Sequence, residues 1–149
     1  MNKKTLSKFC MKKRDATLSG LCFTKPWSMG DYSYATDGVI LIRIPKLKSI
    51  PERNENSPVQ QAAEEMFVKT PKTSIPILKF PIPELYNNPA VVWKINEVFF
   101  RGDMLWKLKN FCRNCYILPL KEKPGGGFSF KRTWIEFDGG DGFIMPVVM

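Results

Sequence analysis

The chain has 149 residues, of which 44% are hydrophobic and 13% aromatic, a composition that supports one domain with a buried core and excludes wholesale disorder. Lys and Arg number 23 against 14 Asp and Glu, a formal net charge of +9, and there is no histidine. The lack of histidine excludes Ser-His-Asp and Cys-His catalytic pairs, so we expect a binding protein and not an enzyme. The excess of positive charge favours a polyanionic partner, most often nucleic acid.

No apolar segment approaches the roughly 20 residues that span a bilayer. The basic segment Met1–Arg14 is not followed by the apolar region of a signal peptide. These features predict a cytoplasmic protein with no membrane partner, whose cysteines are reduced or bound to metal.

The first predicted element is a short helix over residues 5–11. Leu6, Phe9 and Cys10 fall at i, i+3 and i+4 and would form its apolar face. Basic residues surround that face: Lys3, Lys4, Lys8, Lys12, Lys13 and Arg14. Such a cluster is typical either of a solvated surface or of a site for a polyanion.

A β-hairpin is predicted next. The β-rich segments Tyr32–Thr36 and Val39–Ile44 flank Asp37-Gly38, and Asp-Gly at the centre of a type I′ turn is a strong indication of a hairpin. The second segment is apolar until Arg43, which predicts a strand buried on both faces or packed under helices.

Residues 46–80 are polar and rich in proline, and we predict a connecting segment over the surface with one helix inside it. The helix would begin at Pro58, a favoured first helical residue after a Ser57 cap. Its apolar stripe would be Val59, Ala62, Ala63, Met66 and Phe67.

The second half is predicted to contain strands around one helix. Val91–Ile95 and Glu97–Phe100 indicate a strand pair or one bent strand, and Asp103 is expected to cap a helix whose apolar face contains Met104, Leu105, Leu108 and Phe111. Further strands are predicted at Tyr116–Leu120, Phe128–Lys131, Trp134–Phe137 and Phe143–Val148, with a turn at 138–142. The order of elements indicates an α+β fold in a single domain, residues 1–149, with a helix before strands in each half.

Two segments resemble the bacterial DNA sliding clamp, the processivity ring of replicative polymerases. Tyr34-Ala35-Thr36-Asp37-Gly38 before an apolar strand is similar to its Ala-Thr-Asp-Gly segment, and Phe143-Ile144-Met145-Pro146-Val147 is similar to its Met-Pro-Met ending. Small phage and prophage proteins of this length and layout, with a Phe-Asp-Gly-Gly-Asp-Gly segment near the end, are also similar. The resemblance covers residues 30–45 and 91–148 and leaves 46–80 unmatched.

The resemblance implies one clamp-like domain, an antiparallel sheet with two basic helices on one face that contact duplex DNA. The residues that would make this contact are Lys4, Lys8, Lys12, Lys13, Lys107, Lys109 and Arg113. It also implies a head-to-tail homo-oligomer and a pocket for client peptides formed by Thr36, Gly38, Leu41, Met145 and Pro146. The family usually continues its Asp-Gly with His-Arg-Leu, whereas this chain has Val39-Ile40-Leu41, so the polar part of that pocket is missing.

Two function classes follow. The first is a DNA- or replication-associated binding protein, encoded by a phage or prophage and acting in the host cytoplasm. The second is a decoy or inhibitor that binds a replication or defence protein through its clamp-like shape without touching DNA. Salt-dependent binding to duplex DNA separates the two classes, because only the first predicts it.

Other residue patterns offer further sites. Cys112 and Cys115 form a CxxC and, with Cys10 and Cys22, could bind zinc, although the wide spacing of the second pair favours free thiols and no cofactor. Glu136, Asp138 and Asp141 could suggest acid–base chemistry, but Asp beside Gly is typical of turns. The tryptophans, at positions 27, 93, 106 and 134, could include a base-stacking surface, while their periodic spacing favours a core.

Overall fold

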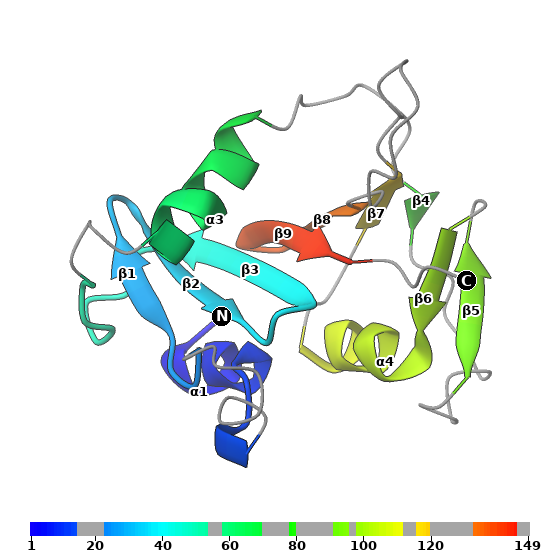
Figure 1. Ribbon diagram of the computed structural model, residues 1–149, viewed down its shortest axis with the longest axis horizontal. Coiled ribbons are helices and arrows are strands. Elements are labelled where there is room, and N and C mark those ends of the chain that lie inside the picture. The colour runs from blue at the N-terminus through cyan, green and yellow to red at the C-terminus, as the bar shows by residue number, and fades with distance from the viewer. Residues whose placement is uncertain are drawn as a thin grey trace. The chain divides into compact units, whose positions relative to one another are not determined.

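The computed structural model describes residues 1–14, 23–53, 58–69, 78–79, 91–95, 98–111, 116–119 and 133–145. Within them the chain has a mixed α+β fold with antiparallel strand pairs, which confirms the predicted fold class. The chain divides into two compact units, Met1–Ser74 with Gly139–Gly142, and Ile75–Asp138 with Phe143–Met149 (Figure 1). None of the helices described is long and apolar enough to cross a membrane.

The first unit is built on three antiparallel strands, β1 (Trp27–Met29), β2 (Tyr32–Thr36) and β3 (Ile40–Pro45). Their register places Trp27 opposite Tyr34 and Tyr34 opposite Arg43, so these side chains share one face of the sheet. In β3, Ile40, Ile42 and Ile44 are at most 2% exposed. On the other face of β3, Leu41 is 9% exposed and Arg43 is half-buried. The predicted hairpin is therefore confirmed, and its second strand is buried except at Arg43.

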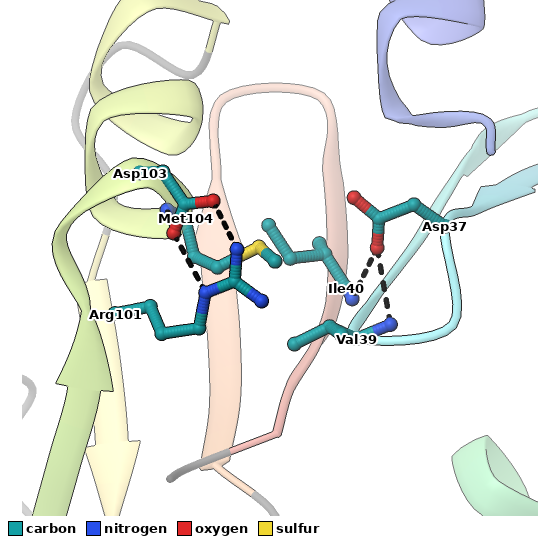
Figure 2. A network of polar contacts seen from close by, with 6 residues as sticks. All are labelled: Asp37, Val39, Ile40, Arg101, Asp103 and Met104. Carbon is teal, nitrogen blue, oxygen red and sulfur yellow. Dashed lines mark hydrogen bonds and ion pairs between the residues drawn. The ribbon is translucent and has the colours of Figure 1, made fainter. Parts of the chain in front are cut away.

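The hairpin turn lies one residue later than predicted. Thr36 pairs with Leu41, and the backbone N–H of Asp37 donates to the carbonyl of Ile40 at 3.3 Å, which makes Gly38 and Val39 the central residues. Gly38 has φ of 92°, where glycine is favoured. Asp37 stands before the turn, and its Oδ1 accepts hydrogen bonds from the N–H groups of Val39 and Ile40 (Figure 2). This Asx-type turn explains the shift.

The N-terminal segment forms α1 (Lys3–Leu6) followed by the 3-10 turn η1 (Ser7–Phe9), so the helix predicted over residues 5–11 begins and ends earlier. In Figure 1, α1 lies on one side of strands β1–β3 and α3 (Pro58–Lys69) on the other. Leu6 and Phe9 are completely buried, as the spacing predicted.

Helix α3 begins at Pro58, as expected. Of its predicted stripe, Ala63 and Phe67 are buried while Ala62 is exposed. The Phe67 ring lies 6.0 Å from the Tyr34 ring, so it docks the helix onto the face of the sheet that carries Tyr34. The predicted Ser57 cap lies outside the described residues.

Residues 46–53 cover the outer edge of β1, a contact that the predicted surface connection did not anticipate. The N–H of Ser28 donates to the Pro51 carbonyl at 2.9 Å, and the N–H of Arg53 donates to the Ser28 carbonyl at 3.2 Å. The hydroxyls of Ser28 and Ser33, 2.7 Å apart and buried, join the sheet to this segment, because Ser28 also donates to the Ile50 carbonyl. An open strand edge is thereby closed to other chains.

In the second unit, β5 (Val92–Ile95) pairs antiparallel with β6 (Val98–Arg101), and α4 (Gly102–Phe111) follows directly. A strand pair is therefore present, and not a single bent strand. Asp103 lies in the first turn of α4 and does not cap it, because the helix already begins at Gly102. The guanidinium of Arg101 holds the Asp103 carboxylate at 3.0 and 2.6 Å (Figure 2).

The same unit pairs β7 (Tyr116–Pro119) with β4 (Leu78–Lys79) and with β8 (Thr133–Phe137). Strand β9 runs from Gly140 to Ile144, so the predicted five-residue turn is shorter, and only Gly139 within it has positive φ, 85°. Trp134 packs edge-on against Phe143 with ring centroids 5.1 Å apart. The strand predicted at Phe128–Lys131 lies outside the described residues.

Candidate nucleic-acid interface

The basic N-terminal segment is fixed to the first unit by apolar and backbone contacts. The Asn2 side chain caps α1 by accepting from the N–H of Thr5 at 2.9 Å. The N–H of Met11 donates to the carbonyls of Phe23, at 2.9 Å, and Thr36, at 3.2 Å. Leu6 and Phe9 are fully buried. These contacts hold the backbone of the segment in place, and its lysine side chains extend from that backbone.

The charged side chains that this segment presents to solvent are all basic. Its exposed cations are Lys3, Lys4, Lys8, Lys12, Lys13 and Arg14, and no acidic residue precedes Asp15. Lys3 extends the surface toward the turn at 47–50, because its Nζ donates to the Ser49 carbonyl at 3.0 Å. Lys48 is exposed in that turn. A surface with one sign of charge attracts polyanions over several ångströms.

The remaining predicted DNA contacts belong to the second unit. On α4, Lys109 is exposed and Lys107 is half-buried, whereas Arg113 lies outside the described residues. The acidic residue of the helix, Asp103, is paired with Arg101. The outer surface of α4 is therefore also positive.

The residues predicted to form a client-peptide pocket are only partly brought together. Thr36, Gly38 and Leu41 lie at one end of the β2–β3 hairpin, where the Thr36 hydroxyl accepts from the Gly38 N–H at 3.0 Å. A Cβ built at Gly38 would lie 3.6 Å from Cε of Met11, so the chain's own N-terminal segment lies beside this end. Met145 is half-buried in the second unit, and Pro146 lies outside the described residues.

Sequence reasoning missed a cluster around Arg43. Its guanidinium makes two hydrogen bonds to the Asp141 carboxylate, 2.7 and 3.0 Å long. The same group lies 4.3 Å from the centre of the Tyr32 ring and 3.9 Å from that of Phe67. Arg43 therefore joins β3, α3 and the returning segment Gly139–Gly142. Asp141 serves as its ion-pair partner, a structural role that differs from acid–base chemistry. The one sequence indication was an arginine inside an apolar strand.

The electrostatic effects in this cluster act in opposite directions. Burial would lower the pKa of Arg43, but the hydrogen bonds and charge of Asp141, with smaller contributions from Tyr32 and Tyr34, raise that pKa above its ordinary value. The guanidinium thus stays charged. Burial raises the pKa of Tyr34, and Arg43 opposes that rise.

Alkaline pH is expected to destabilise the fold partly through Tyr34. Its pKa is raised in the folded state, so above about pH 10 the unfolded tyrosine ionises while the folded one still holds its proton. The stability that this group contributes is present below about pH 10 and is lost as the pH rises. Urea unfolding between about pH 9 and about pH 11 should show a smaller loss for Tyr34→Phe than for the natural chain. Equal losses would contradict this assignment.

The candidate metal ligands cannot be compared as a set. Cys10 is buried and forms no disulfide with any described residue, while Cys22, Cys112 and Cys115 lie outside the described residues. No group of His, Cys, Asp and Glu suited to a metal ion occurs among the residues described.

The four tryptophans have different environments. Trp27 and Trp134 are buried, at 1% and 4% exposure, and Trp93 is half-buried. Trp106 is 40% exposed. The periodic spacing therefore predicted the core correctly at two positions, whereas α4 presents Trp106 to solvent.

Comparison with protein family models, with curated proteins and with solved structures finds no significant match to this chain.

Proposed function

We propose that the protein is a non-enzymatic DNA-binding protein with a sliding-clamp-like fold, encoded by a phage or prophage and associated with DNA replication. The observation that supports this proposal is the fixed basic segment Met1–Arg14, whose exposed cations stand on a backbone held by Leu6, Phe9 and Met11. A backbone that is already ordered loses less conformational entropy when its cations meet a polyanion than the backbone of a disordered tail.

The mechanism is electrostatic contact with the phosphate backbone. A lysine ammonium acts as a point charge without preference for a base edge, so binding is independent of sequence. Each phosphate contact releases condensed counterions, which makes the affinity fall steeply with salt. Lys107 and Lys109 offer a similar contact on the second unit, and a head-to-tail homo-oligomer would repeat such contacts around a duplex.

Removing charge from the N-terminal segment tests the proposal. The variant Lys4→Gln/Lys8→Gln/Lys12→Gln should weaken duplex binding and reduce the salt slope of log Kobs by about 0.9 for every lysine that contacts a phosphate. The measurement is fluorescence anisotropy with a labelled duplex of random sequence at salt concentrations of about 50 to 200 mM.

A matched control removes the same charge elsewhere. Lys25→Gln/Lys46→Gln/Lys94→Gln has the same net charge as the first variant and should keep most of the salt slope. Equal salt slopes in the two variants would mean that binding depends on net charge alone. The proposal would be refuted if the natural chain did not bind duplex DNA at low salt.

A protein partner is a second candidate, favoured by the exposed valines of the second unit. Val91 and Val92 are 37% and 38% exposed at the start of β5, where apolar side chains would suit a protein surface. A decoy or inhibitor of a replication or defence protein would use this surface. Light scattering with and without duplex DNA separates the candidates, because a decoy would show no salt-dependent change in mass when DNA is added.

A further inference from the structure

Trp106 is a large aromatic side chain that α4 exposes to solvent. The helix buries its other large apolar residues of the first turns, Met104, Leu105 and Leu108, at 8% exposure or less. At 100° per residue, Trp106 lies on the side of the helix opposite to these three. The residue is 40% exposed, so a substantial part of its apolar surface remains available to a ligand.

The surroundings of Trp106 are basic and polar. Nζ of Lys109, one turn further along, lies 5.6 Å from the centre of the Trp106 ring, within the range of a cation–π contact. Asn110, also one turn away, is exposed. Asp103, one turn before Trp106, has its carboxylate bound by Arg101 (Figure 2). The indole of Trp106 is complementary to a nucleotide base, and the ammonium of Lys109 is complementary to its phosphate. The carboxylate of Asp103 does not oppose the phosphate strongly, because Arg101 neutralises it.

We propose that Trp106 and Lys109 form a stacking site for an unpaired nucleotide of single-stranded nucleic acid. The base stacks on the indole, and the ammonium of Lys109, which lies over the ring in the free protein, moves to an adjacent phosphate. The base must be unpaired, because both faces of a base inside a duplex are covered by its neighbours. The site accepts any base, since every base has a π-face. This inference rests on the proposed nucleic-acid function and adds a second ligand class on a different unit from the N-terminal lysines.

Binding of two oligonucleotides to the full chain tests the site. One is a labelled oligo(dT), and the other has the same length and phosphates but abasic sugars. Trp106→Ala should weaken oligo(dT) binding by roughly 5-fold to 100-fold, the range found when stacking aromatics are replaced by alanine. The same variant should bind the abasic strand as the natural chain does, because no base is there to stack. Trp106→Phe should retain most of the affinity for oligo(dT).

A control on the same helix removes another exposed aromatic side chain. Phe111 is 36% exposed and lies about 140° around the helix from Trp106, so Phe111→Ala should leave oligo(dT) binding unchanged. Circular dichroism and thermal unfolding of each variant confirm that the fold is kept. Lys109→Gln should weaken binding of both strands, because both carry the phosphate.

Each other outcome overturns the site. Equal weakening of both strands by Trp106→Ala would mean that the indole acts on the fold or on charge and not by stacking. A loss of self-association in Trp106→Ala, without a change in oligo(dT) binding, would mean that a second copy covers the indole. If duplex DNA binds through the N-terminal lysines and Trp106→Ala has no effect, the stacking site fails while the proposed function stands. If neither nucleic acid binds, both fail.

Discussion

Replacing Gly142 with alanine is expected to lower the free energy of unfolding by about 3 kcal/mol. A Cβ at this position would overlap the carbonyl oxygen of Leu41 and lie 3.2 Å from Cα of Ile42. Both neighbours are backbone atoms of β3, and Ile42 is fully buried, so no flexible side chain can move aside. The strand itself must shift, which breaks its packing. Urea unfolding monitored by circular dichroism measures the change.

Gly139→Ala is the matched control in the same segment. A Cβ at Gly139 would meet nothing within 4 Å, but its φ of 85° disfavours any side chain. We expect a loss of about 1 to 2 kcal/mol from the backbone conformation alone. The close approach of Gly142 to β3 is refuted if Gly139→Ala destabilises the protein as much as Gly142→Ala or more.

Replacing Arg43 with alanine is expected to destabilise the protein by about 2 to 3 kcal/mol. The side chains of Arg43 and Asp141 are 16% and 19% exposed, so the pair is nearly buried, and removing one member leaves the other charge without its partner. Fully buried pairs lose about 3 to 5 kcal/mol in this way, and the remaining exposure reduces that value here. The variant also removes the cation that lies over the rings of Tyr32 and Phe67.

A double-mutant cycle isolates the ion pair. Arg43→Ala, Asp141→Asn and the double variant should show a coupling energy of roughly 1 to 2 kcal/mol. Lys46→Ala serves as the control, because its ion pair with Glu52 is exposed, at 39% and 63%, and such pairs contribute at most about 1 kcal/mol. Additive effects of the Arg43 and Asp141 substitutions would show that the two residues act separately.

The parts of the fold that depend on neighbouring residues were predictable from the sequence. The hairpin from Tyr32 to Pro45 follows from two β-rich segments around Asp37-Gly38. Helix α4 follows from the spacing of Met104, Leu105 and Leu108. The exact turn in the hairpin was missed because the Asp37 side chain takes over the backbone hydrogen bonds, an option that a count of turn residues does not reveal.

The parts that depend on distant residues could not be predicted. Arg43 and Asp141 are 98 positions apart, and nothing in either local sequence identifies the other. The contact of residues 51–53 with β1 could not be predicted either. It is made by backbone atoms of Ser28 and Arg53, and every residue type has these atoms. The exposure of Trp106 was accessible in principle, since a helical projection places it opposite Leu105 and Leu108. The spacing of the four tryptophans taken together does not distinguish the exposed Trp106 from the buried ones.

The membership of Gly139–Gly142 in the first unit has a consequence for the order of events during protein synthesis. Residues 1–74 leave the ribosome long before Asp141. Arg43 therefore has no ion-pair partner until most of the second unit has been synthesised. The first unit therefore cannot reach its final stability as an early co-translational intermediate, and closing so long a loop is slow. A chain that terminates before Gly139 would leave Arg43 without Asp141, which makes premature termination products natural substrates for proteolysis.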